Sequence, residues 1–499
     1  MEQRFERRTV ACLQRYLWQP QEREQTQELR LGDDMPDIGG VIAVRGQCIL
    51  RSKEWQGDSI GFSGGIMAWV LYAPADGGQA RMVEAWIPVQ MKWNVPQTWR
   101  EGSIRVSMTL QSIDARSISA RKMVVRANVS ALAEALGPWE TEVFVPAQQD
   151  SEQIQMLRCQ YPVVLPMEAG EKLFQVEEEI AMPAGAPQPQ KILSFELVPK
   201  VTERDVVGGK AVFRGEVGLR LCYETSDREV CGVDLEASFS QFTDLDREHG
   251  KDATVSVVMA VTSGEPELQD GRVLLKCGLV AQYLVYDETI VELVEDAYST
   301  ENELDVVTQR LVMPAMAERC TEDIRCVVEM DVEASGVVDA WVCPGQPRVR
   351  RAGDLTELTM DGSVWVLYLD REGALQGVCC PWERRVEHPA VDQSSCYGRW
   401  AQLGRPMVTV NAGKLEAKLD MTLLTHTVDE SERVMVSSVE VGGPLDTGKD
   451  RPSLILRRME SSRLWDLAKE CGSTVDAIRK ANGMSDEEMV GSLILIPIP

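Results

Sequence analysis

The eight residues KMVVRANV at positions 122–129 recur in the chain as RVLLKCGL at 272–279 and as KLEAKLDM at 414–421. In each copy a basic residue occupies the first and fifth positions, and apolar residues occupy the second, fourth, sixth and eighth. Successive side chains of a β-strand point to opposite faces, so this alternation predicts a strand with one apolar face and one basic, solvent-facing face. Three such copies predict a repeated β domain.

A second landmark gives nearly the same repeat length. A glycine followed by an alternating strand that ends in tyrosine occurs at 64–72, at 215–223 and, two residues shorter, at 362–368. A turn-forming segment follows each tyrosine, which is typical of a β-hairpin. The three tyrosines are 151 and 145 residues apart, and the first basic residues of the three copies are 150 and 142 apart. Both landmarks therefore indicate one period, with equivalent tyrosines at Tyr72, Tyr223 and Tyr368.

Each copy also contains a middle strand, at 83–91, 231–242 and 377–386. Many short strands separated by turns favour a sandwich or a partly open barrel. We therefore predict a mainly β protein with three sandwich-like domains at about 27–137, 176–298 and 318–441. Residues 138–175 and 299–317 are expected to connect these domains, and 442–452 to form a linker. For residues 1–26 the sequence leaves a first strand and a short helix open.

Composition and charge limit the classes of partner. The 499 residues carry a formal net charge of −26, and a surface this acidic repels nucleic acid and anionic lipid. No stretch reaches the roughly 18 apolar residues of a membrane-spanning helix, and no apolar segment of signal-peptide length follows the first arginines. The 13 cysteines have no framework spacing, which is typical of a reducing compartment. We expect a soluble cytoplasmic protein.

The pattern changes at residues 453–499. SLILRR at 453–458 predicts a short strand, and LWDLAKECG at 464–472 and VDAIRKANG at 475–483 predict two helices that end at glycine. LILIPIP at 493–499 predicts a last strand, so the order is β-α-α-β. Five apolar residues at helical spacing are expected to form the core of this module: Leu464, Leu467, Ala468, Val475 and Ile478.

This module resembles a LysM domain over its whole length. The resemblance rests on LWDLA at 464–468, on Thr474 and Val475, on Asn482, and on the pattern G-x-x-x-L-I-P at 491–497. It implies a shallow groove between the loop after the first strand and the loop before the last. In LysM domains this groove commonly binds glycans that contain N-acetylglucosamine. The groove residues expected here are Ser461, Ser462, Arg463, Leu464, Asn482, Gly483, Met484, Met489, Val490 and Gly491.

The first loop departs from the LysM pattern. The family's Gly-Asp-Thr is replaced by Ser461-Ser462-Arg463, which removes a glycine that would let the backbone approach a sugar closely. An arginine suits the carboxylates of a protein surface, and Met484 and Met489 suit irregular apolar surfaces. The residues therefore favour a protein over a glycan as the ligand of the groove.

The layout of the whole chain resembles the SipL-type morphogenetic proteins of the spore coat, which contain SPOCS domains. The segment DMPDI at 34–38, the hairpins that end in tyrosine, and the order of three β domains before a LysM-like module carry this resemblance. It implies a protein of the mother cell of a sporulating bacterium, located at the forespore surface. The partner that it implies is a coat morphogenetic protein of the ATPase type, to which the protein would link the forming spore.

Short motifs typical of enzymes occur in unsuitable contexts. GFSGG at 61–65 matches a hydrolase nucleophile elbow, but a strand rather than a helix follows it. GPLDTGKD at 443–450 approaches a P-loop, but an aspartate replaces the magnesium-binding hydroxyl. The group Cys379, Cys380, His388 and Cys396 lacks the C-x-x-C spacing of structural zinc sites. We therefore expect no catalytic residue, no cofactor and no metal.

These observations predict a non-enzymatic scaffold in spore-coat assembly. The alternative is a cell-wall protein that binds peptidoglycan or another N-acetylglucosamine glycan through its LysM-like module, and a hydrolase is a third reading. The residues of the loop 460–464 distinguish the first two functions, because this loop would contact the ligand. The two functions also differ in whether the protein binds peptidoglycan or a coat protein.

Overall fold

The structure is a computed structural model, and it describes residues 5–95, 102–146, 154–446, 452–459, 463–483 and 491–498. Within these ranges the chain folds almost entirely into antiparallel strands, with two short helices near the C-terminus. This confirms the prediction of a mainly β protein with a small helix-containing C-terminal module.

Three domains share one strand order. Domain 1 consists of β1 (Phe5–Arg30), β2 (Ile38–Gln56), β3 (Ser59–Pro74), β4 (Arg81–Asn94), β5 (Ser103–Ser119) and β6 (Lys122–Pro146). Domain 2 consists of β7 (Ile154–Ile180), β8 (Pro189–Val207), β9 (Lys210–Thr225), β10 (Val230–Asp244), β11 (Thr254–Gln269) and β12 (Arg272–Ser299). In both domains the first, sixth and fifth strands form one sheet, and the second, third and fourth form the other.

Domain 3 has the same topology with interrupted strands. Its strands are β14 (Ala315–Met330), β15 (Gly336–Pro344), β16 (Arg348–Ala352), β17 (Leu355–Leu369), β18 (Leu375–Pro389), β19 (Ser394–Leu403), β20 (Met407–Asn411) and β21 (Lys414–Asp429). β15 and β16 together take the place of one strand beside β17, and β19 and β20 take the place of one strand beside β21. The strand β13 (Asn302–Leu311) precedes this domain, and β22 (Arg433–Pro444) follows it and pairs with β13.

The segments that define the sequence repeat begin β6, β12 and β21. Their alternate apolar residues are buried in the three domain cores, as the two-residue period requires. The first basic residue of each lies on the outer face beside a carboxylate of a neighbouring strand or loop. The pairs are Lys122–Glu28 at 2.6 Å, Arg272–Glu179 at 3.4 Å and Lys414–Asp331 at 2.7 Å.

The three tyrosines occupy equivalent positions near the ends of β3, β9 and β17, and all three are buried. The hydroxyl of Tyr72 donates to the carbonyl of Pro36 over 3.1 Å, and that of Tyr223 to the carbonyl of Pro187 over 2.9 Å. Both acceptors precede their tyrosine by 36 residues. The bond holds the loop between the first two strands against the central strand, and satisfies a buried hydroxyl.

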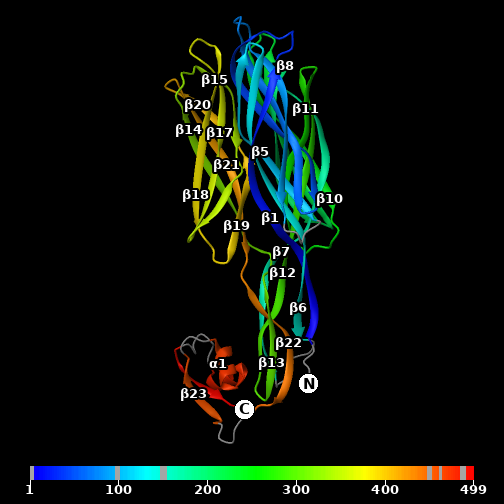
Figure 1. The fold of residues 1–499 in the computed structure, drawn as a ribbon, viewed down its shortest axis with the longest axis vertical. Coiled ribbons are helices and arrows are strands. Elements are labelled where there is room, and N and C mark those ends of the chain that lie inside the picture. Colours follow the sequence, from blue (N-terminus) through cyan, green and yellow to red (C-terminus); the bar gives the residue numbers. More distant parts are fainter. Residues whose placement is uncertain are drawn as a thin grey trace.

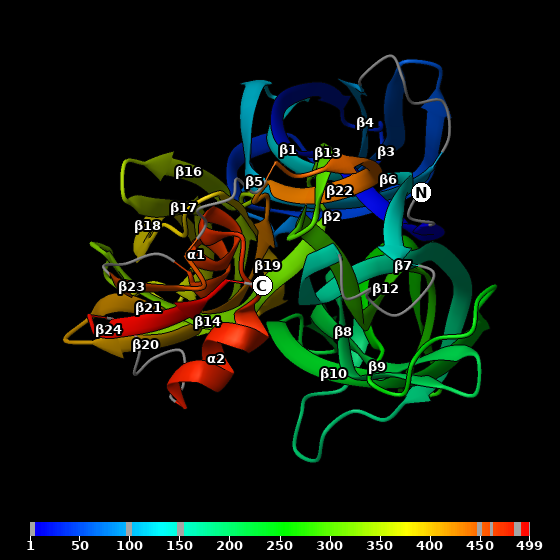
Figure 2. The ribbon, with the colours of Figure 1, turned by 90° about the horizontal axis from the view of Figure 1, so that it is seen from below.

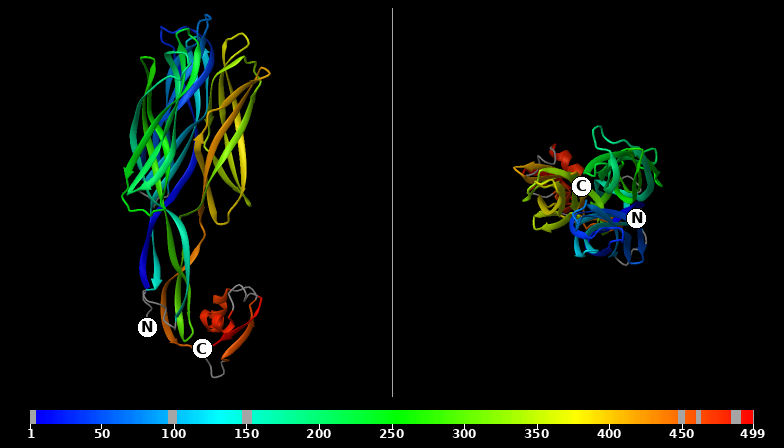
Figure 3. Two further views of the ribbon diagram at one scale, coloured as in Figure 1. Left: turned by 180° about the vertical axis from the view of Figure 1, so that it is seen from behind. Right: turned by 90° about the horizontal axis from the view of Figure 1, so that it is seen from above.

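The domains stand side by side around a common long axis (Figures 2 and 3). From their lower end a narrower extension projects along that axis (Figure 1). We call this extension the stalk; it consists of residues 5–14, 137–146, 154–165, 287–299, 302–311 and 433–444. Its apolar interior includes Cys12, Val143, Leu165, Leu293, Met435 and Val439.

The stalk contains most of the segments that the sequence assigned outside the domains. From Phe5 onward, residues 1–26 belong to β1. The expected connector 138–175 lies in β6 and β7 on either side of residues 147–153, and 299–317 includes β13. Strands in narrow ribbons leave an edge in water, where prolines and polar residues cost little. Polar, proline-containing sequence is therefore compatible with strand in the stalk.

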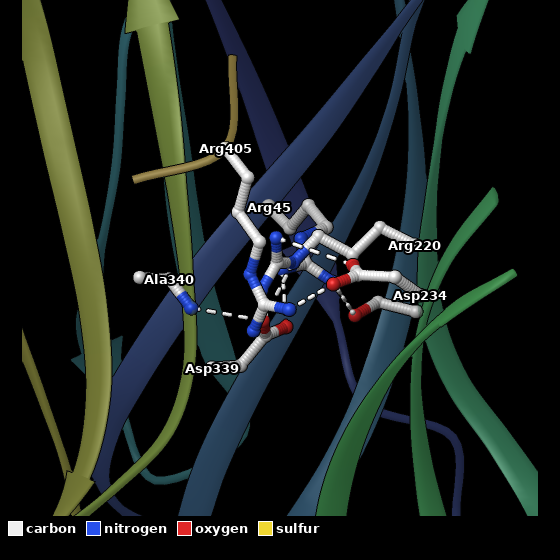
Figure 4. A network of polar contacts seen from close by, with 7 residues as sticks. Arg45, Arg220, Asp234, Asp339, Ala340 and Arg405 are labelled. Carbon is white, nitrogen blue, oxygen red and sulfur yellow. Dashed lines mark hydrogen bonds and ion pairs between the residues drawn. The ribbon is translucent and has the colours of Figure 1, made fainter. Parts of the chain in front are cut away.

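A buried ionic network joins the three domains near their axis (Figure 4). Asp339 of domain 3, which is completely buried, pairs with Arg45 of domain 1 and with Arg220 of domain 2. Arg220 also lies 3.5 Å from Asp234, which pairs with Arg405. Burial alone would raise the pKa of Asp339, but Arg45 and Arg220 hold it below its ordinary value. One carboxylate thus pairs with arginines from both neighbouring domains.

All 13 cysteines are free thiols. Burial raises the pKa of several of them, including Cys222 and Cys277 to about 12, so these thiols remain protonated. In the described part of the chain, no helix has the length and apolar character needed to cross a membrane.

Candidate functional site

The C-terminal module is built from β23 (Leu454–Arg458), α1 (Leu464–Cys471), α2 (Val475–Asn482) and β24 (Leu493–Pro497). β23 and β24 pair in antiparallel fashion, which gives the predicted β-α-α-β order. Gly472 and Gly483 end the two helices with φ angles of +63° and +61°, which glycine adopts without strain. The hydroxyl of Thr474 caps α2 by accepting from the amide of Ala477 over 3.1 Å.

The core of the module contains the residues that helical spacing predicted. Leu464, Leu467, Ala468 and Ile478 are at most 4% exposed, and Val475 packs against them. Ile494 and Ile496 of β24 complete this core from the strand side. Tyr298 of the stalk also belongs to it, so the core of the module continues into the rest of the molecule.

Half of the predicted groove residues have a described position. Ser461, Ser462, Met484, Met489 and Val490 lie outside the described residues. Of the others, Leu464 is buried and Gly483 is the C-cap of α2, so both contribute to the framework of the module. Gly491 has a φ angle of +79°, and its amide donates to the carbonyl of Met459 over 2.7 Å. This bond joins the residues at which the described parts of the two predicted loops end.

Asn482 ties α2 to β24. Its side-chain amide donates to the carbonyls of Ile478 and Leu495, both over 2.7 Å, and its side-chain oxygen accepts from the amide of Leu495 over 2.8 Å. These three bonds use the donors and the acceptor of the amide group much as a neighbouring strand would. The asparagine of the LysM-like pattern therefore has a structural role in this chain.

Arg463 lies at the edge of the module that faces the stalk. One of its guanidinium nitrogens is 3.7 Å from a carboxylate oxygen of Glu295, and its side chain is 74% exposed. A long, exposed ion pair of this kind contributes little to stability. The guanidinium group of Arg463 is therefore accessible to a partner, although one of its nitrogens faces Glu295 of the protein's own stalk.

A row of leucines covers the outer face of the two strands. Leu454, Leu456 and Leu493 are 51–60% exposed, and Leu495 is 36% exposed. Leu456 and Leu495 are cross-strand partners, so their side chains lie next to each other. Continuous apolar runs, LIL in β23 and LILI in β24, place apolar residues on both faces of the ribbon. That feature of the sequence could have predicted this leucine face, which our groove prediction missed.

The module rests against the stalk through α1. Trp465 and Lys469 both donate to Asp296, and the hydroxyl of Tyr298 donates to the carbonyl of Ser473 over 2.9 Å. The rings of Tyr298 and Trp465 meet edge to face at 4.8 Å between centroids. Burial raises the pKa of Tyr298 to about 12, so its hydroxyl remains a donor. These contacts set the direction in which the leucine face points.

The enzyme-like motifs occupy ordinary strand positions. Ser63 lies within β3, and its hydroxyl is 2.7 Å from that of Ser52. His388 contacts Glu322 at 3.0 Å, and no cluster of three metal-binding side chains occurs among the residues that the structure describes. The P-loop-like segment falls partly on residues 447–451, which are outside the described ranges.

Comparison with known proteins relates one part of the chain to a family. Residues 188–265 match the family model "SipL, SPOCS domain". The matched SPOCS segment covers β8 to β10 and most of β11, which is the larger part of domain 2. No curated protein and no solved structure matches the chain.

Proposed function

We propose that this protein is a non-enzymatic scaffold of spore-coat assembly, which works in the mother cell at the forespore surface. Its C-terminal module, which we propose is a LysM domain, binds a coat morphogenetic protein of the ATPase type, and the β domains add further contacts. The SPOCS match in domain 2 supports a role related to sporulation. The shared strand order of the three domains extends this support to domains 1 and 3.

The observation that carries the binding proposal is the leucine face of the module. Four large apolar side chains grouped on one small ribbon are unusual on a surface in contact with water, and such patches mark sites of protein interaction. A sugar offers mainly hydroxyl groups to these side chains, whereas a protein partner can bury them against its own apolar residues. The leucine face therefore favours a protein ligand over a glycan.

The test is binding of the purified full-length chain to the purified morphogenetic ATPase of the same coat. We expect the double variant Leu456→Lys/Leu495→Lys to bind at least tenfold more weakly than the wild type, because two charges enter an apolar contact. The control is Leu173→Lys, which changes a 64% exposed leucine in domain 2 and should bind normally. Equal binding by the wild type and the double variant would contradict a role for the leucine face.

Glycan binding is the other outcome that this test must distinguish. The same proteins are titrated with chitin oligomers and with peptidoglycan fragments, and we expect no saturable binding. Tight sugar binding by the wild type, together with absent binding to the ATPase, would replace the scaffold proposal by a cell-wall function.

A further inference from the structure

Four arginines gather between the domains with a single carboxylate. Arg15 of β1 and Arg105 of β5 donate to the two oxygens of Glu134 over 2.8 Å and 2.6 Å. The other two are Arg319 of β14 and Arg399 of β19; desolvation by burial lowers the pKa of both, and the nearby charge of Arg105 lowers it further. Among the described residues, Glu134 is the one carboxylate that forms ion pairs within this group. Four guanidinium groups against one carboxylate leave three positive charges without a counter-charge.

Two of these arginines, the buried Arg399 and the partly buried Arg319, have few hydrogen-bond partners. Arg399 is 5% exposed, and its bond is to the hydroxyl of Ser256 in domain 2. Arg319 buries one of its terminal nitrogens with no hydrogen-bond partner in the described residues. Removing a charge from water without pairing it is strongly unfavourable, so native proteins neutralise such groups. An unpartnered buried donor of this kind can bind a water or an ion, and the excess of positive charge here favours an anion.

A buried histidine lies in the same row of the sheet. His426 of β21 is the cross-strand partner of both Arg319 and Tyr397, so the three side chains share one face. His426 is 2% exposed, and its Nδ1 atom has no partner in the described part of the chain. Burial and the nearby arginines lower the pKa of this imidazole to about 2, which keeps it neutral with one N–H to donate.

A cavity of about 350 Å³ reaches this row from the surface. Arg15, Tyr286, Tyr397 and His426 are among its lining residues, whereas Arg319 and Arg399 are not. Val312 and Glu430, which are exposed, lie where it meets solvent. Two acids also line it, but both already have partners. Asp429 pairs with Arg433 at 2.7 Å, and Glu430 accepts from the hydroxyl of Ser395 over 2.7 Å.

We propose that this cluster binds a small dianionic oxyanion of the class of inorganic phosphate or sulfate, held by Arg319, Arg399 and His426 and reached through the cavity where His426 lines it. Guanidinium groups present paired donors that match the oxygens of such an anion, and the neutral imidazole adds a donor without adding charge. A dianion would neutralise two of the three uncompensated charges. Since Arg399 also contacts Ser256, the anion would strengthen the junction of domains 2 and 3.

Thermal unfolding of the full chain tests this site. Phosphate or sulfate replaces chloride at constant ionic strength, and we expect the unfolding temperature of the wild type to rise continuously with the logarithm of anion concentration. The unfolding temperatures of Arg319→Gln and Arg399→Gln should rise less than that of the wild type, by the part that exceeds the general stabilisation of folded proteins by these salts. The matched control is Arg325→Gln, which changes an exposed arginine of the same strand β14 that pairs with Asp420 at 3.3 Å. It should keep the rise.

Direct binding provides the second measurement. Equilibrium dialysis with labelled phosphate should find one saturable site per chain in the wild type and in Arg325→Gln, and at least tenfold weaker binding in Arg319→Gln. In chloride alone, Arg319→Gln should be at least as stable as the wild type, because it removes an unpaired charge. If neither anion binds or stabilises the wild type relative to chloride, or if Arg319→Gln responds as the wild type does, the proposal is overturned.

Discussion

Trp465 of α1 donates a hydrogen bond from its indole nitrogen to a carboxylate oxygen of Asp296 in the stalk, over 2.8 Å. Lys469, one turn further along the same helix, donates to both oxygens of that carboxylate over 2.7 Å. A single stalk residue therefore contacts two consecutive turns of α1. The C-terminal module has a defined orientation on the stalk, in addition to its covalent connection through residues 442–452.

Removing this carboxylate should loosen the module. We expect Asp296→Ala to weaken the docking of α1 by on the order of 1 kcal/mol, because the charge-assisted bonds from Trp465 and Lys469 are lost from a partly exposed site. Hydrogen exchange measures the effect, and the amides of 464–471 should exchange faster in the variant. Glu440→Ala, which removes another stalk carboxylate, is the control and should leave these amides unchanged. Equal protection in both variants would count against the docking contact.

Two leucines of the module should separate stability from binding. Leu464 is 4% exposed in the module core, and Leu464→Ala should cost about 2–5 kcal/mol of unfolding free energy. Leu456 is 56% exposed, and Leu456→Ala should change stability by no more than about 0.5 kcal/mol while weakening partner binding. Hydrogen exchange of the amides of the module, followed in the full chain as the temperature rises, measures the stability effect. A similar loss in both variants would contradict the assignment of core and surface.

The sequence predicted the repeated parts of the fold well because their pattern follows directly from strand geometry. The alternation in KMVVRANV and its two copies depends only on which face of a strand is buried. It can therefore be predicted from the order of residues alone. The tyrosines were recoverable for the same reason. The stalk was not, because its strands leave edges and faces in water and their composition matches that of a connector.

Contacts between domains left no signal in the sequence. Asp339 is a lone aspartate in a strand, and nothing near it indicates that Arg45 and Arg220, more than 100 residues away, complete its environment. The same holds for the group around Glu134. The LysM-like pattern located the module, but the roles of Asn482 and Leu456 depend on which side of the ribbon each side chain occupies.

Removing Asp339, the acidic residue shared by the ionic network of the domain junction, should lower the stability of the protein strongly. We expect Asp339→Ala to reduce the unfolding free energy by about 3–5 kcal/mol, because Arg45 would remain buried without a counter-charge and Arg220 would keep only its longer contact with Asp234. Glu203→Ala removes one partner of an exposed pair with Arg214 and should cost less than about 1 kcal/mol. Urea unfolding of both variants measures the difference. If Asp339→Ala is as stable as Glu203→Ala, the network does not hold the domains together.

The decrease in stability at acid pH should depend on Glu134. Burial alone would raise its pKa, but Arg105 and Arg15 lower it from an ordinary value of 4.5 to about 2. Since the folded-state pKa is the lower one, ionised Glu134 stabilises the protein above pH 4.5, and this contribution is lost as pH falls from about 4.5 to about 2. Glu134→Gln should therefore be less stable than the wild type at pH 7, and the difference should narrow by pH 3. Glu142→Gln, in the same strand but in an exposed pair with Arg7, should follow the wild type throughout. Urea unfolding in chloride buffers between pH 7 and pH 3 measures both, and a constant gap between the wild type and Glu134→Gln would show that Glu134 does not titrate in this way.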